Sequence, residues 1–363
     1  MKTIIRLGLI LFTLLATISA NGQELSTGSV VGRHIYGLAR DVNGDPLLLN
    51  ETPLIYDSTG FEQRLPVGDK LFIVSGLGDT LGGLYLTQYD VKTRRYIDTL
   101  SFDLTQVDGL TRPRGGIKTP WNSVLFGESE IIDSAIPQTF VDQYKYFYKG
   151  QADLVNAYHY GWPTEAIILD EDGASKIIKD YAVGRVFASE IYLMPDGKTL
   201  YLFDGDNTGL LYLFVADKIN SLSSGTLYSV SIDSGKAVYK FLGHSSALRM
   251  KLKMKKIEFD KLFDKAPVEN NSCADKFIYV NTIFGEECLK TNTKNKRYAG
   301  LFEPVRMTAI QRVGQPLTVF SEVELMPENK QITLTIKNGS KRNYRLGQNT
   351  GMGSNYVIQE SEL

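Results

Sequence analysis

Short apolar or alternating runs, separated by turn residues, recur along almost the whole chain. Examples are residues 70–74 and 209–215, and turn pairs such as Asp196-Gly197 stand between runs of this kind. Runs of this length that are rich in aromatic and β-branched residues predict strands, whereas the 3.6-residue spacing of helices is scarce here. The pattern predicts an all-β fold, with segments 137–160 and 257–272 as loops or short helices.

One hairpin-sized segment occurs twice. Residues 189–202 recur as residues 321–334 with the shared start Ser-Glu-x-x-Leu-Met-Pro, and a looser copy begins at Thr164. Each copy predicts a strand, a tight turn and a second strand, with Glu190 or Glu322 at the start of the first strand. Repeated hairpins in an all-β chain of this size indicate a β-propeller of five or six blades, and a two-sheet sandwich is the competing architecture. In a propeller the starts of the innermost strands converge, which would bring the two glutamates together.

The N-terminus has the order of a secretory signal. Lys2 and Arg6 precede the apolar segment 7–16, and small residues follow, with suitable cleavage points after Ala20 and Gly22. The apolar segment is shorter than the roughly 20 residues that span a bilayer. We therefore predict a Sec-type signal over residues 1–22, export to the periplasm or the medium, and no membrane attachment after cleavage.

The mature chain, residues 23–363, is then expected to form a single propeller domain. Its 40 basic and 41 acidic residues give a net charge of −1, which provides no overall field to attract nucleic acid. In the basic cluster 249–256, charged and apolar residues alternate, which predicts a solvated edge strand rather than a polyanion site. Outside the cytoplasm Cys273 and Cys288 are expected to form a disulfide, and two free buried thiols are the alternative.

Several common mechanisms find no support in the sequence. The three histidines lack zinc-type spacing, there is no Gly-x-Ser-x-Gly motif, and the glycines of 76–83 lack the spacing of a nucleotide-binding loop. Segment 204–209, Asp-Gly-Asp-Asn-Thr-Gly, opens like a calcium loop, but Val215 stands where an EF-hand needs glutamate.

Carboxylates offer a different route to a metal site. Calcium binds six to eight oxygen atoms, and Asp206 together with Glu190 and Glu322 could supply several of them. The alternative for each of these acids is a solvated surface carboxylate. The strand-start glutamates therefore predict a calcium site in the propeller channel.

Several segments between about residues 110 and 335 resemble the PhoX-type alkaline phosphatase family. The clearest is 116–128, with Thr119-Pro120-Trp121, and others are 159–165, 184–190, 202–207 and two later stretches around Glu287 and Glu303. The resemblance implies a β-propeller with calcium and iron in its channel that hydrolyses phosphate esters. In that family metal ions neutralise the phosphoryl oxygens and activate the attacking oxygen.

By this resemblance Glu190 and Glu322 are metal ligands, Asp206 is a third ligand, and Glu128 matches the first glutamate of its motif, which implies a catalytic role. Arg114 stands where the family has the cysteine that bridges its irons. A cation cannot replace a thiolate bridge, so calcium is expected rather than iron. Arg114 is expected to bind phosphate directly, and a structural arginine is the alternative.

Two functions follow. The first is an exported, calcium-dependent phosphoesterase that acts on a small phosphate ester. The alternative is a non-catalytic, calcium-stabilised propeller that binds a small ligand or a partner. The chain stops soon after the segment around Glu322, so the last blade is expected to be abbreviated unless the chain itself is shortened.

Overall fold

The structure is a computed structural model that describes residues 25–234, 236–313, 317–326, 331–336, 341–345 and 357–358. Strands dominate these residues, which confirms the all-β fold class. None of the described helices is long and apolar enough to cross a membrane. The predicted signal segment 1–22 lies outside the described residues, so export stays a prediction.

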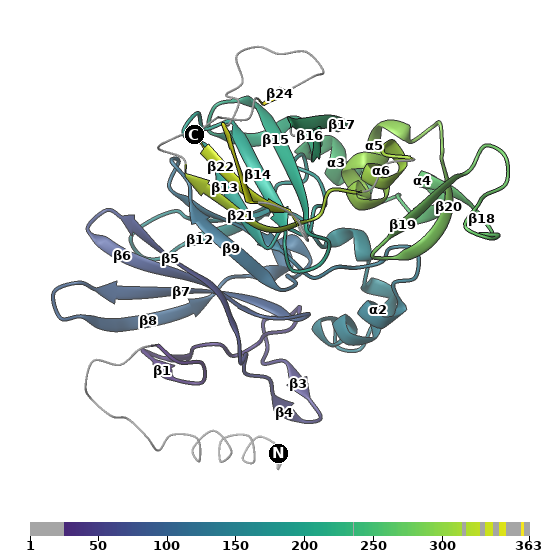
Figure 1. Ribbon diagram of the computed structural model, residues 1–363. Helices are drawn as coiled ribbons and strands as arrows, with labels where there is room; N and C mark the ends of the chain where they lie inside the picture. Colours follow the sequence, from purple (N-terminus) through teal and green to yellow (C-terminus); the bar gives the residue numbers. More distant parts are fainter. Residues whose placement is uncertain are drawn as a thin grey trace.

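Four antiparallel sheets form the body of the molecule, and within each one the strands follow one another in chain order (Figure 1). The first contains β5 (Thr59–Val67), β6 (Lys70–Gly78), β7 (Gly82–Asp90) and β8 (Arg95–Ser101). The second contains β9 (Pro113–Lys118), β10 (Ser123–Glu128), β11 (Thr164–Ile168) and β12 (Ser175–Lys179). The third contains β13 (Glu190–Leu193), β14 (Thr199–Asp204), β15 (Leu210–Lys218), β16 (Ser221–Asp233) and β17 (Lys236–Ser246), with β24 (Val357–Ile358) at its edge. The fourth contains β21 (Phe320–Met326), β22 (Gln331–Ile336) and β23 (Lys341–Arg345).

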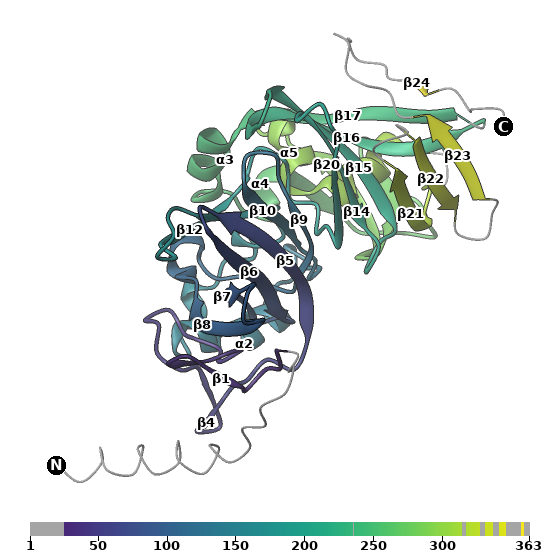
Figure 2. The same ribbon diagram turned by 90° about the vertical axis from the view of Figure 1, so that its left-hand side faces the viewer.

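The first strands of successive sheets lie close together. β5 packs on β9 and β9 packs on β13, while the hydroxyl of Tyr192 donates a 2.9 Å hydrogen bond to the carbonyl of Val323 in β21. Glycine permits the approach: a Cβ at Gly60 would lie 1.8 Å from the Pro113 carbonyl oxygen, and one at Gly115 would lie 2.4 Å from that of Ser189. Figure 2 shows the sheets following an arc from β8 to β23. This succession of meander sheets is β-propeller-like.

The second strands show why the sequence pattern reads as continuous rather than alternating. Every residue of β10 and of β14 is buried, because neighbouring sheets cover both faces. Strands buried on both faces need apolar residues at successive positions, as in Leu200-Tyr-Leu-Phe203. Outer strands such as β8 alternate exposed and less exposed residues instead.

The remaining elements precede or interrupt the sheets. The hairpins β1 (Val30–Val31) with β2 (His34–Ile35) and β3 (Leu48–Leu49) with β4 (Thr52–Pro53) come first. Helix α2 (Gln138–Tyr144) and short 3₁₀ turns lie between β10 and β11, as predicted for 137–160. After β17 come α3 (Ala247–Met254), α4 (Phe259–Leu262), a small sheet of β18 (Phe263–Ala266), β20 (Gly285–Thr291) and β19 (Ile278–Thr282), then α5 (Lys296–Phe302) and α6 (Pro304–Gln311). The prediction of a short helix within 257–272 is confirmed by α4.

The prediction of an edge strand over 249–256 is wrong, because most of this segment lies in helix α3. Met250 and Met254, four residues apart, are both buried, whereas Leu248 and Leu252 are exposed. The side chain of Ser246 caps the helix by accepting a hydrogen bond from the amide of Arg249. The charged and apolar residues alternate, but only the i, i+4 pair finds a core to pack on.

The repeated segments are confirmed as hairpins, β13 with β14 and β21 with β22. Glu190 begins β13, and Glu322 is the third residue of β21. The looser copy at Thr164 is also a hairpin, β11 with β12, but it forms the outer half of its sheet. The described residues contain four blade-like sheets, and the number of blades in the whole chain stays a prediction.

Cys273 and Cys288 form a disulfide, as expected for an exported chain, and Cys288 is buried. The bond joins β20 to the loop before β19. It therefore braces the small sheet internally, and β19 of that sheet packs on α6.

We predict that Cys273→Ser lowers the free energy of unfolding by about 3 kcal/mol, since opening a loop of this length increases the entropy of the unfolded chain. Urea unfolding of the oxidised protein and the variant measures the loss. Reduction of the wild type should reproduce it, and equal stability of oxidised wild type and variant would contradict the prediction.

Candidate functional site

Polar side chains gather at one edge of the sheets. β5, β9 and β13 begin at this edge, and because neighbouring strands are antiparallel, β6, β10 and β14 end there. We call it the strand-start edge. It carries the turns after Gly78, Glu128 and Asp204.

Two arginines dominate the strand-start edge beside β9. Nη2 of Arg114 lies 3.0 Å from Oδ1 of Asp79, and its Nη1 donates to the carbonyl oxygens of Pro113 and Gly78 at 3.0 and 3.3 Å. Nε of Arg112 lies 3.4 Å from the same Asp79 oxygen, and its Nη2 lies 3.2 Å from Oε2 of Glu130. Arg112 Nε and Glu130 Oε2 are buried without a hydrogen-bond partner. Asp79, which both arginines face, therefore does not satisfy all of their N–H donors.

The turn between β14 and β15 docks on the end of β10. The buried carboxylate of Asp204 accepts 2.7 Å hydrogen bonds from the side chains of Asn207 and Thr208, and burial raises its pKa to about 7. Asn207 also donates to the Ser129 carbonyl at 2.9 Å, and the Ser129 hydroxyl donates to Asp206 at 3.1 Å. Asp206 is thereby held beside the chain that follows Glu128.

Glu128 lies in the interior, one residue before this contact. Its carboxylate accepts hydrogen bonds from the amides of Thr111, Gly161 and Trp162 at 3.0 to 3.1 Å. The ammonium of Lys179 lies 3.1 Å away, and neither side chain is exposed. Burial raises the pKa of Glu128 and lowers the pKa of Lys179, because both charges are removed from water, while the ion pair opposes both shifts.

The carboxylate of Glu128 has no exposed surface, a lysine partner and three amide donors, so as placed it stabilises the interior. Its expected catalytic role stays a prediction. The side chain of Arg114 is 23% exposed, and its expected role in binding phosphate stays a prediction.

The three expected calcium ligands do not form one site in the described residues. Asp206 contacts Ser129, Glu190 accepts a hydrogen bond from the Tyr192 hydroxyl, and the exposed Glu322 accepts one from Thr335 at 3.3 Å. The described part of the chain contains no group of three or more His, Cys, Asp or Glu placed to hold a metal ion. The calcium site stays a prediction. Both cysteines of the chain are bonded to each other, so neither is a thiolate for iron.

Tyr192 nevertheless shows that some of these acids are neighbours. Burial raises the pKa of its hydroxyl strongly, and the charges of Glu190, Glu324 and Glu322 raise it further. Its hydroxyl donates to Glu190 and to the carbonyl of Val323, which stands between Glu322 and Glu324. The convergence of Glu190 and Glu322 on one metal site stays a prediction.

Sequence reasoning missed Asp79, Arg112, Glu130 and Ser129. Asp79 lies in the glycine cluster 76–83, whose glycine spacing does not match a nucleotide-binding loop and for which the sequence predicted no other function. Glu130 and Ser129 directly follow the motif glutamate. The spacing Arg112-Pro-Arg114 was a usable signal, since both ends of such a tripeptide can present guanidinium groups at the start of a strand.

No family model matches the chain, and no curated protein matches it. Among solved structures, PhoX from Pseudomonas fluorescens in complex with vanadate, a transition state analogue, aligns over 82% of this chain and 63% of its own, with 12% identity and a TM-score of 0.46. A putative 6-phosphogluconolactonase from Bacteroides uniformis aligns over 89% of this chain and 94% of its own, with 14% identity and a TM-score of 0.22. One from Bacteroides fragilis aligns over 89% and 92%, with 11% identity and a TM-score of 0.26. The likeness concerns the fold, and the chain spans 63% of the PhoX chain.

We predict that Glu128→Ala lowers the free energy of unfolding by about 3–5 kcal/mol, because Lys179 and three amides lose their buried partner. Urea unfolding measures this, with Glu171→Ala in the exposed β11–β12 turn as the control. A Glu128→Ala protein as stable as the control, but without ligand binding or activity, would restore the catalytic interpretation.

Proposed function

We propose that this protein is an exported propeller that binds small phosphate esters at Arg112 and Arg114. The observation that carries the proposal is the pair of guanidinium groups on one carboxylate, Asp79, at the strand-start edge. The planar fork of arginine matches two oxygens of a phosphate group, and two arginines can neutralise its double charge.

A phosphate group can compete with Asp79 for the two arginines at this edge. The side chain of Asp79 is 54% exposed, and exposed ion pairs contribute little free energy. Nε of Arg112 has no hydrogen-bond partner, so a phosphate oxygen there would satisfy a buried donor. The carbonyls of Gly78 and Pro113 meanwhile fix the Arg114 fork, which reduces the entropy lost on binding.

The class of ligand also follows from the motif resemblance described for segment 116–128. That segment forms β9 and β10, so the resemblance and the two arginines fall on the same hairpin. Ligand binding, rather than hydrolysis, is the function that the described side chains support best, since Glu128 is inaccessible.

We predict that Arg114→Met weakens binding of p-nitrophenyl phosphate by about tenfold or more, through loss of one charge-assisted contact. Titration calorimetry with a chelator present measures the affinity. Arg95→Met, an exposed arginine at the opposite edge of the first sheet, is the matched control. Unchanged affinity in an Arg112→Met/Arg114→Met double variant would contradict the proposal.

A second candidate is calcium-dependent hydrolysis of the bound ester. It is favoured by one observation: the Tyr192 hydroxyl joins Glu190 to the carbonyl of Val323, which stands between Glu322 and Glu324. Carboxylate oxygens are the ligands that calcium prefers. As placed, these residues do not form a three-ligand group, so no catalytic step is assigned to the ion.

For this candidate we predict turnover of p-nitrophenyl phosphate with calcium and none after chelation. Glu190→Gln and Glu322→Gln should lower the rate while leaving ester affinity in chelator unchanged. Absence of turnover with calcium would remove the enzyme and leave the binding module. Calcium-dependent turnover that survives both substitutions would place the ion elsewhere.

A further inference from the structure

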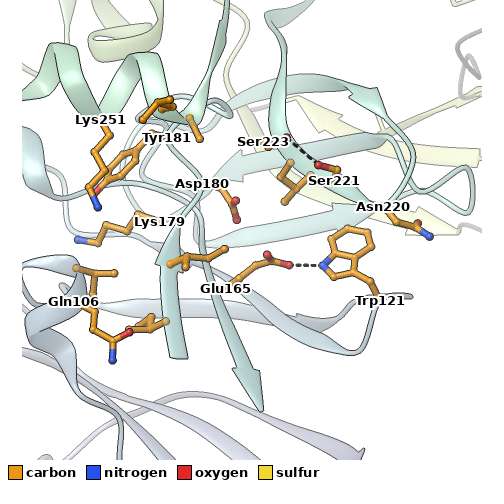
Figure 3. A pocket seen from close by; sticks show the side chains of 16 residues that line it. Gln106, Trp121, Glu165, Lys179, Asp180, Tyr181, Asn220, Ser221, Ser223 and Lys251 are labelled. Carbon is orange, nitrogen blue, oxygen red and sulfur yellow. Dashed lines mark hydrogen bonds between the residues drawn. The ribbon is translucent and has the colours of Figure 1, made fainter. Parts of the chain in front are cut away.

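A cavity of about 400 Å³ lies between the second and third sheets, away from the two arginines. β11 and β12, the turn joining β15 to β16, and helix α3 surround it (Figure 3). Trp121, in the turn between β9 and β10, closes one side. Trp121 and the turn of residues 220–223 lie opposite to the strand-start edge, whereas Asp180 directly follows β12, which ends at that edge. The cavity therefore runs along β11 and β12, and it shares no lining residue with the arginine site.

Two carboxyl groups lie near the middle of this cavity, as Figure 3 shows. Glu165 is 6% exposed and accepts hydrogen bonds from Trp121 Nε1 at 2.5 Å and from the Ser123 hydroxyl at 2.6 Å. Asp180 is 5% exposed, and its Oδ2 is buried with no hydrogen-bond partner. Such an orphaned oxygen costs free energy unless a ligand satisfies it.

Of the other buried acids in the described residues, Asp204 is satisfied by Asn207 and Thr208, and the rest have a cationic partner. Glu128 has Lys179, while Glu287 and Glu303 share the fully buried Arg306 at 2.6 and 2.8 Å. Within the described residues neither Glu165 nor Asp180 has a lysine or arginine nitrogen within 4.0 Å. Two adjacent buried acids with no cation are the exception in this structure.

The lysines that line the cavity do not fill this role. The ammonium of Lys179 contacts Glu128 and donates to the His159 carbonyl at 2.7 Å. Lys251 belongs to the exposed face of α3, and it forms no ion pair with Glu165 or Asp180 in the described residues. The described residues therefore supply no positive charge to pair with the two carboxyl groups.

We infer that this cavity binds a small organic ammonium compound, with its positive charge between Glu165 and Asp180. The rings of Trp121 and Tyr181 line the same space, and aromatic rings attract ammonium groups. The volume exceeds that of a bare ion, and Asn220, Ser221 and Ser223 offer polar atoms to a hydroxylated ligand. The inference does not depend on phosphate-ester binding, because neither Arg112 nor Arg114 lines this cavity.

Binding has a measurable proton balance. Burial and the charge of Glu165 raise the pKa of Asp180 well above its usual value, which favours the protonated carboxyl in the free protein. An ammonium group favours the carboxylate, so the Asp180 O–H bond breaks and the proton passes to buffer. The other titratable groups that line the cavity are Glu165, Lys179, Tyr181 and Lys251.

The test titrates the purified protein with ethanolamine, choline and glucosamine, and with glucose as the neutral match of glucosamine. Fluorescence of the two tryptophans, Trp121 in the cavity wall and Trp162 against Tyr181, reports occupancy. Calorimetry in two buffers of different ionisation enthalpy counts protons. We expect saturable binding of an ammonium compound, with release of up to one proton. If glucosamine is the compound that binds, its affinity should be at least about tenfold higher than that of glucose.

Asp180→Asn should abolish proton release and weaken binding by about tenfold or more, and Glu165→Gln, which still accepts from Trp121, should also weaken it. Asp172→Asn, 96% exposed in the β11–β12 turn, is the matched control, and thermal unfolding checks that each variant folds. The inference is overturned if no ammonium compound binds at millimolar concentration, or if only calcium chloride binds. It is also overturned if glucose binds as tightly as glucosamine, or if folded Asp180→Asn binds ammonium compounds as tightly as the wild type does.

Discussion

The buried carboxylate of Glu128 is the constraint on which the second sheet and the strand-start edge depend. Its oxygens accept hydrogen bonds from the amides of Thr111, Gly161 and Trp162 and pair with the ammonium of Lys179. These contacts join the ends of β10 and β12 to the segments that precede β9 and β11. A charge in the interior is tolerated only when its partners are complete, which makes this arrangement all-or-none. Ser129 and Glu130 follow directly, so their positions are fixed by it.

Close approach of the first strands is the second condition. Gly60 and Gly115 remove the side chains that would separate β5 from β9 and β9 from β13. The polar residues of three sheets consequently share one edge, where Arg112, Arg114 and Asp79 meet. The accessible chemistry of the protein lies in these turns, and the strands hold them in place.

The two proposed sites use ion pairing in opposite ways. At the strand-start edge arginines are paired with a half-exposed carboxylate that a phosphate can displace. In the cavity beside Trp121, two carboxyl groups are buried without any cation. Each site therefore specifies a ligand charge, negative at the first and positive at the second, although the chain as a whole carries a formal charge of only −1.

By itself the sequence determined the strands, the hairpin repeat and the all-β class, because strand periodicity and turn residues are local properties. It left Cys273 and Cys288 either paired or free, and the tertiary structure decided that they are bonded. The sequence predicted a strand for the segment that forms α3, because charged and apolar residues alternate there. The helix forms because Met250 and Met254, four residues apart, both pack into the core. The sequence placed Glu128 in the chemistry, and only the tertiary structure showed that three distant amides and Lys179 enclose it. Only the tertiary structure, likewise, brought Asp79 to Arg114 and Asp180 to Glu165, because the net charge around a side chain is set by contacts between residues that are far apart in the chain.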